Sequence, residues 1–238
     1  MIWIYGLPQE FASQAHHDLN LLGTRPTIPV ALNLDKRDPV TAIAKKIAKN
    51  GALINKVVFD KRQVSQAEAD TGKVMTLASL RGFVAGVALG KSAIGRATAP
   101  VRSDGLSDLE RIKTVASMYA KKIAEHRVLG KQLADRQSML SVGAVQVVLG
   151  ALAHDLTASE VSDDVIAKRL DALVAELAKV HWERGPRWNG IGGKLNPDTN
   201  KFSVGGSKEY GYAIHRALTE EKDRAYKRVR ATSVRPAA

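Results

Sequence analysis

The spacing of apolar residues along the chain predicts a mainly α-helical protein. After Asp38 and Pro39, which suit the N-cap and first position of a helix, apolar residues recur every three or four positions up to Ile47. Asn50-Gly51 is a stop signal for that helix. The same spacing predicts further helices at 8–22, 74–89, 107–129, 139–156, 162–180 and 207–230, with a short helical turn around 30–34.

Two apolar runs are typical of strands, "MIWIY" at residues 1–5 and "INKVVF" at residues 54–59. An apolar strand at the first residue needs a partner along its edge, so we expect that upstream sequence is missing. Segments 91–105 and 181–207 are rich in Gly and Pro and are predicted to be loops. The expected fold is therefore a helical, bundle-like domain with a small β element near the N-terminus.

The loop at 91–105 suggests a division of the chain. Residues 1–102 are expected to form an α-rich segment with short strands, and residues 103–230 a helical domain that carries a Trp/Gly/Arg loop. Residues 231–238 are expected to be a disordered tail.

Composition narrows the possible classes of function. The chain has no cysteine, which excludes a disulfide framework, a thiolate zinc site and a cysteine nucleophile, and which suits the cytoplasm. Its apolar runs fall short of the 18 residues expected of a membrane-spanning helix. No spacing of carboxylates and no nucleophile motif indicates catalysis. We therefore expect no cofactor, no membrane association and no catalytic residue.

Charge points to a polyanionic partner. The net charge of +12 is uneven: residues 1–102 carry 14 basic and 7 acidic groups, residues 103–180 carry 10 and 11, and residues 181–238 carry 12 and 6. Two basic ends around a neutral middle are typical of surfaces that face DNA or RNA. General solubility charge is the alternative interpretation.

Two stretches resemble known sites only superficially. His16 and His17 in "SQAHHDLNLLG" point about 100° apart on a helix, so they cannot chelate one ion together, and no metal site is expected. "AGVALGKSAIG" lacks the first glycine of a P-loop, since Ala85 stands there, and it follows a predicted helix rather than a strand. We interpret Gly90 as a helix stop.

The most suggestive surface segment is "ERGPRWNGIGGK". It places Arg184, Arg187, Trp188 and Lys194 in a glycine-containing loop, where cations can pair with phosphates and an indole can stack on a base. The alternative is that Trp182 and Trp188 anchor the loop to the core. The candidate nucleic-acid-binding residues are Arg184, Arg187, Trp188, Lys194, Lys208 and Arg216.

Three segments in order resemble the DGQHR-domain family, and among its members the DndB-like proteins of DNA phosphorothioate modification. Residues 9–48 resemble a Q-x-F-x-D-L-N segment followed by D-x-R-D, residues 57–87 resemble a basic–Ser element followed by K-x-x-T-L-x-x-L, and residues 177–190 resemble a late Trp/Arg/Gly feature. The residues that match the first segment are Gln14, His17, Asp18, Asn20, Asp35, Arg37 and Asp38. The resemblance implies a structural role for them, or a role at a seam with another half.

The motif that names that family, and the ParB-like half that carries it, are absent from this chain. The resemblance therefore implies the C-terminal half of such a protein, a truncated relative, or one part of a split pair. We expect a DNA-binding accessory or regulatory protein of a bacterial DNA-modification or defence system, most simply a transcriptional regulator.

Two alternatives stay open. One is a nucleotide-hydrolysing subunit that a DGQHR-bearing partner completes in trans. The other is a scaffold that docks a modification protein through apolar residues around Trp3 and Ile4.

Overall fold

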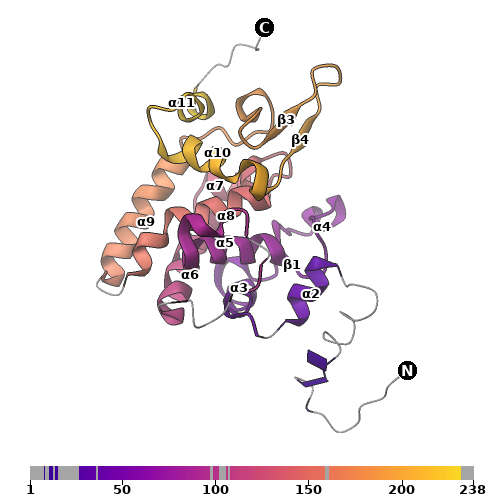
Figure 1. Cartoon of the computed structure of the whole chain (residues 1–238), viewed down its shortest axis with the longest axis vertical. Coiled ribbons are helices and arrows are strands. Elements are labelled where there is room, and N and C mark those ends of the chain that lie inside the picture. Colours follow the sequence, from indigo (N-terminus) through magenta and orange to yellow (C-terminus); the bar gives the residue numbers. More distant parts are fainter. Residues whose placement is uncertain are drawn as a thin grey trace.

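The computed structural model describes residues 8, 11–12, 14–15, 27–35, 37–96, 99–101, 106, 108–158 and 161–231. In these ranges the protein is mainly α, as the sequence predicts (Figure 1). Ten α-helices are described there: α2 (Ile28–Leu34), α3 (Pro39–Lys49), α4 (Gln66–Asp70), α5 (Leu77–Leu89), α6 (Leu109–Glu125), α7 (Leu129–Ala134), α8 (Gly143–Leu152), α9 (Asp163–Leu177), α10 (Ser207–Thr219) and α11 (Arg224–Arg230).

Several predicted helix signals are confirmed. The Asp38 carboxylate accepts hydrogen bonds from the backbone N–H groups of Val40 and Thr41 and so caps α3, while α5 ends at Gly90, whose φ of 59° favours glycine. The predicted turn around 30–34 is α2, and the predicted helix at 162–180 is α9. Residues 11, 12, 14 and 15 of the predicted first helix are helical.

Other boundaries differ from the prediction. Helix α6 begins after Asp108, whose carboxylate accepts a hydrogen bond from Arg111 N–H, and Leu109 in its first turn is exposed. It ends at Glu125 because His126 Nδ1 accepts from the N–H groups that begin the next helical segment. The predicted helix at 139–156 consists of the 3₁₀ turn η4 (Met139–Ser141), α8 and the 3₁₀ turn η5 (His154–Thr157). The predicted final helix is divided into α10 and α11, and Asp223 caps α11.

The described β structure consists of two small sheets. Strand β1 (Val57–Val58), within the predicted strand at 54–59, pairs in parallel with β2 (Met75–Thr76). Strands β3 (Gly193–Leu195) and β4 (Phe202–Val204) form an antiparallel hairpin inside the segment predicted as loop. In that segment η6 (Pro186–Trp188) forms a further 3₁₀ turn.

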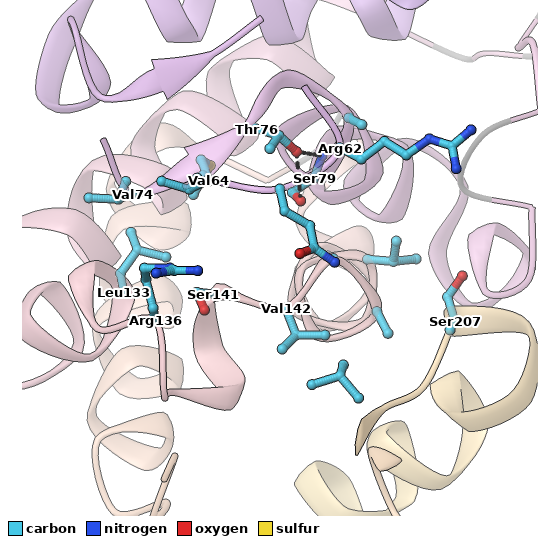
Figure 2. Close-up of a pocket in the computed structure, with 18 of the residues that line it drawn as sticks. Arg62, Val64, Val74, Thr76, Ser79, Leu133, Arg136, Ser141, Val142 and Ser207 are labelled. Atoms are coloured by element: carbon cyan, nitrogen blue, oxygen red, sulfur yellow. Dashed lines mark hydrogen bonds between the residues drawn. The ribbon is translucent and has the colours of Figure 1, made fainter. Parts of the chain in front are cut away.

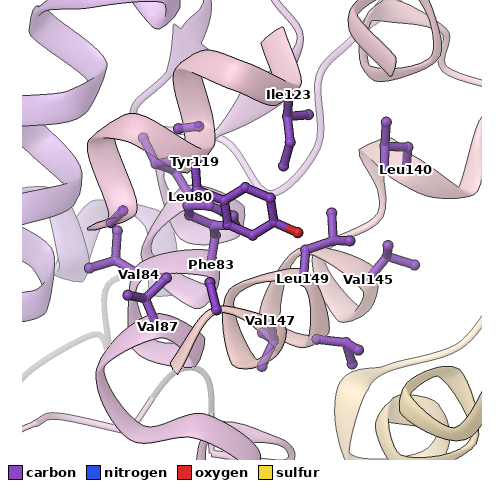
Figure 3. Close-up of a cluster of buried hydrophobic side chains, with 14 of the residues drawn as sticks. Leu80, Phe83, Val84, Val87, Tyr119, Ile123, Leu140, Val145, Val147 and Leu149 are labelled. Atoms are coloured by element: carbon purple, nitrogen blue, oxygen red, sulfur yellow. The ribbon is translucent and has the colours of Figure 1, made fainter. Parts of the chain in front are cut away.

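One hydrophobic core joins the elements on both sides of residue 102, and α5 and α8 at its centre share the most extensive contact. Gly86 and Gly150 permit this contact, because a Cβ on Gly86 would lie 2.2 Å from Val147 O and one on Gly150 would lie 1.9 Å from Phe83 O. Phe83 packs on Tyr119 of α6 with ring centroids 5.3 Å apart (Figure 3).

Helices α5 and α8 run in the same direction. Ser79, in the first turn of α5, lies beside Gly143 at the start of α8, and Gly90 after the end of α5 lies beside His154 after the end of α8. The N-terminal ends of both helices therefore lie side by side at one surface of the protein.

A buried ion pair fastens α3 to α5. The Arg81 guanidinium is fully buried and donates to Asp38 Oδ2 through Nε at 2.9 Å and through a terminal nitrogen at 2.5 Å. The same terminal nitrogen donates to Ala99 O at 2.6 Å. This pair connects α3, α5 and the segment after η2 (Gly90–Ala93).

Some expectations concern residues outside the described ranges. They include the strand at 1–5, the surface around Trp3 and Ile4, and residues 232–238 of the expected tail. Within the described ranges, every helix is too short or too polar to cross a bilayer.

Candidate functional site

A pocket of about 490 Å³ opens where α5, α8 and α10 begin. Four cationic residues line it, Arg62, Lys73, Arg136 and Arg184, and no Asp or Glu is among its described lining residues. We call it the cationic pocket. None of the four cations forms an ion pair with a carboxylate of the described residues. Cations that converge on one pocket without a carboxylate partner favour an anionic ligand.

Arg62 and Lys73 reach the pocket from the two flanks of α4. This short helix has a complete capping box, in which Ser65 Oγ accepts from Glu68 N–H and the Glu68 carboxylate accepts from Ser65 N–H. Lys61 pairs with the same carboxylate at 2.8 Å, and Lys73 Nζ donates to Asn55 O at 2.8 Å. These contacts hold the loop that carries the two cations against β1 and β2.

Arg136 and Arg184 come from segments paired by an antiparallel bridge between Ser138 and Glu183. Arg184 N–H donates to Gln137 O at 2.9 Å within this pairing. Arg136 also donates to Gln66 Oε1 at 2.8 Å and so contacts α4. Figure 2 shows Arg62 and Arg136 toward opposite ends of the pocket, with Thr76, Ser79 and Val142 between them.

The environment of Arg184 disfavours its own charge. Burial of the guanidinium, followed by repulsion from Arg136, lowers the pKa of Arg184 from its ordinary value, and nearby Asp135 opposes this shift. Arg184 Nε is buried and has no hydrogen-bond partner among the described residues. A bound anion would offset both the desolvation and the repulsion.

Hydroxyls and backbone N–H groups complete the lining. Thr76 Oγ1 accepts from Ser79 N–H at 3.2 Å and lies 3.1 Å from Ser79 Oγ, a contact drawn in Figure 2. Helices α8 and α10 begin beside the pocket at Val142 and Gly206 without a side-chain cap. The first N–H groups of a helix lack partners within it and carry the positive end of its dipole, so these termini reinforce the cations.

The predicted nucleic-acid residues do not share one surface. Arg184 lies in the cationic pocket, whereas Arg216 lies on α10 beside a separate hollow with Arg224 and Arg228, 4.0 Å from Asp223. Arg187 Nε donates to Ala231 O at 3.2 Å, which ties the loop to the end of α11.

The remaining predicted residues are Lys194, Lys208 and Trp188. Lys194 is exposed on β3 and Lys208 is exposed in the first turn of α10. The stacking role expected for Trp188 is corrected, because its side chain is 0% exposed and lies against Trp182 with centroids 5.5 Å apart. Both indoles donate to backbone carbonyls, Trp182 to Leu177 and Trp188 to His181. The two tryptophans therefore anchor the loop to the core.

The structure describes four of the seven residues taken from the family resemblance, Gln14, Asp35, Arg37 and Asp38. His17, Asp18 and Asn20 lie outside the described residues, and Gln14 is half-buried. Asp35 ends α2 and accepts from Arg37 N–H at 2.9 Å, while Arg37 is exposed. Asp38 has a structural role, as the cap of α3 and the partner of Arg81.

Sequence reasoning missed Arg62, Lys73 and Arg136 because they are separated along the chain and follow no motif spacing. The family resemblance could have indicated this site. Its segment at 57–87 contains Lys73, Thr76 and Ser79, and its segment at 177–190 contains Arg184. Two of the three segments that carry the family resemblance thus meet at one pocket.

Among the described residues, no group of three or more His, Asp or Glu side chains is placed to hold a metal ion. Comparisons with known proteins add no relative. The chain matches no protein-family model, no curated protein and no solved structure.

Proposed function

We propose that this protein binds nucleic acid, DNA in the first instance, by engaging phosphate in the cationic pocket. The observation that carries the proposal is the set of four cations around one pocket whose described lining contains no carboxylate. Phosphate contacts from Lys, Arg, hydroxyls and helix N-termini are the common basis of nucleic-acid affinity. The net charge of +12 supports the same partner.

The family resemblance gives this binding a context. A DNA-binding accessory or regulatory protein of a bacterial DNA-modification or defence system, most simply a transcriptional regulator, is the role that the resemblance implies. The meeting of two resembling segments at the cationic pocket supports it. The DNA would be contacted here, and a modification protein is the expected second partner.

Nucleotide hydrolysis is the less favoured function. The described lining of the cationic pocket contains no Asp, Glu or His, the residue types that would hold a magnesium ion or act as general base. A partner would have to contribute them, as the trans-completed alternative requires.

The test is a salt titration of binding to fluorescently labelled DNA, read by fluorescence anisotropy. Four phosphate contacts give a slope of log affinity against log salt of about −3 to −4. The double variant Arg136→Ala/Arg184→Ala should lower the magnitude of that slope by about 2. Arg169→Ala, on the exposed face of α9 and outside the pocket, is the matched control and should leave it unchanged. A flat slope, or equal slopes for all three proteins, would refute the proposal.

A further inference from the structure

The shape of the cationic pocket restricts which form of nucleic acid can reach its cations. Its volume of about 490 Å³ is that of a small-molecule site rather than of a flat surface. Duplex DNA is a rigid rod whose grooves are read by elements that protrude from a protein. At the cationic pocket, by contrast, the half-buried Arg184 and Lys73 line a hollow. A rod would contact the exposed Arg62 and Arg136 but would not reach the half-buried pair.

The lining of the pocket is mixed. Beside its cations and hydroxyls it contains six large apolar side chains: Val64, Val74, Leu133, Val142, Val147 and Val204. Figure 2 shows Val64, Val74 and Leu133 grouped near Arg136, with Val142 toward the middle. A nucleotide offers a partner to both kinds of lining residue, because its phosphate is anionic whereas the faces of its base are apolar.

From this match we infer that the cationic pocket holds one unpaired nucleotide of a strand, with its base against the apolar side chains near Arg136 and with its own and the adjoining phosphates on the cations. This inference rests on the proposed function and deepens it: the preferred partner is single-stranded or has a free strand end. The buried indoles of Trp182 and Trp188 do not supply stacking, so aliphatic contacts hold the base. Such contacts discriminate weakly among bases.

Two sources could supply the nucleotide, a DNA strand or a free nucleoside monophosphate. A competition assay distinguishes the two sources. A labelled single-stranded oligonucleotide is bound to the protein and its fluorescence anisotropy is followed. The competitors are the unlabelled strand, an end-closed duplex, dAMP and inorganic phosphate. We expect the strand to compete at least tenfold better than the duplex, with a salt slope of about −2.8 for four contacts. Competition by dAMP well above that by inorganic phosphate identifies the free nucleotide as a second source and supports the inference.

Two outcomes overturn the inference. The first is equal competition by strand and duplex, and the second is equal competition by dAMP and inorganic phosphate. If Arg136→Ala/Arg184→Ala still weakens binding in those cases, phosphate engagement in the pocket stands and only the unpaired nucleotide is refuted. If no DNA binds at all, the proposed function fails with it.

A variant of the apolar wall makes the test independent of charge. Val74→Asn places an amide on the half-buried apolar side of the pocket and leaves its four cations in place. We expect it to reduce the preference for strand over duplex at least threefold while the duplex affinity is kept. Thermal unfolding of the variant checks that it is folded, and an unchanged preference in the folded variant contradicts the inference.

Discussion

Arg136 and Arg184 line the same pocket because an antiparallel bridge at Ser138 and Glu183 pairs their backbone segments. Backbone hydrogen bonds, including the one from Arg184 N–H to Gln137 O, therefore hold the two guanidinium groups near each other. No carboxylate among the described lining residues lies between them. An anion bound in the pocket would offset the cost of this arrangement.

The arginine pair gives the first prediction. Arg136→Glu should weaken DNA binding more than Arg136→Ala. The new carboxylate would pair with Arg184 and so occupy the position beside Arg184 that is proposed for phosphate. Anisotropy at several salt concentrations measures both variants. Arg169→Glu makes the same charge change on α9 and should have the smaller effect; an equal loss for both Glu variants would mean that only net charge matters.

The second prediction concerns the buried ion pair. Arg81→Met should lower the free energy of unfolding by about 3–5 kcal/mol, because it leaves the buried Asp38 carboxylate without its guanidinium. Urea denaturation followed by circular dichroism measures the loss. Asp38→Asn combined with Arg81→Met should lose less than the two single changes together. Arg37→Ala, at an exposed neighbour, should change stability by less than about 0.5 kcal/mol.

The third prediction concerns the contact between α5 and α8. Gly150→Ala should destabilise the protein by about 2 kcal/mol or more, because its Cβ would lie 1.9 Å from Phe83 O and the helices would have to separate. Thermal unfolding measures the change. Gly206→Ala meets nothing within 4 Å and should cost less. Equal losses at the two positions would contradict close packing as the cause.

The fourth prediction concerns pH. Burial of His215, followed by repulsion from Lys91, lowers the pKa of its imidazole below 6.5, with Glu220 opposing. The unfolded chain therefore binds a proton that the folded protein does not, and the free energy of unfolding should fall as pH falls through 6.5 toward the lowered value. Urea denaturation between pH 5 and 7.5 should show a shallower fall for His215→Gln. The exposed His181→Gln should keep the wild-type profile; identical profiles for both variants would disprove the role of His215.

The sequence predicted those parts of the fold that local chemistry determines. Asp38 and Gly90 sit at helix ends for reasons contained in a few neighbouring residues. The hairpin of β3 and β4 was missed because its strands have only three residues each, too few for the alternation that marks a strand. The burial of Trp188 follows from its contact with Trp182, which periodicity cannot reveal.

The candidate site was predicted only through Arg184. The other pocket cations depend on long-range contacts: Arg136 reaches α4 through Gln66, and Lys73 reaches Asn55 across the small parallel sheet. Charge counts along the chain indicated an anionic partner, but they placed it on the basic termini. They could not show that Arg136, from the neutral middle, would meet Arg184.

The parallel course of α5 and α8 means that the main chain contributes to the electropositive character of this surface. Two aligned peptide dipoles end there, and neither helix has an acidic residue in its first turn to neutralise them. The close contact of the two helices at Gly86 and Gly150 thus adds a smaller, fixed contribution to that of the side-chain cations. Replacing surface arginines can therefore tune attraction for anions, whereas removing it entirely would require rebuilding the interior.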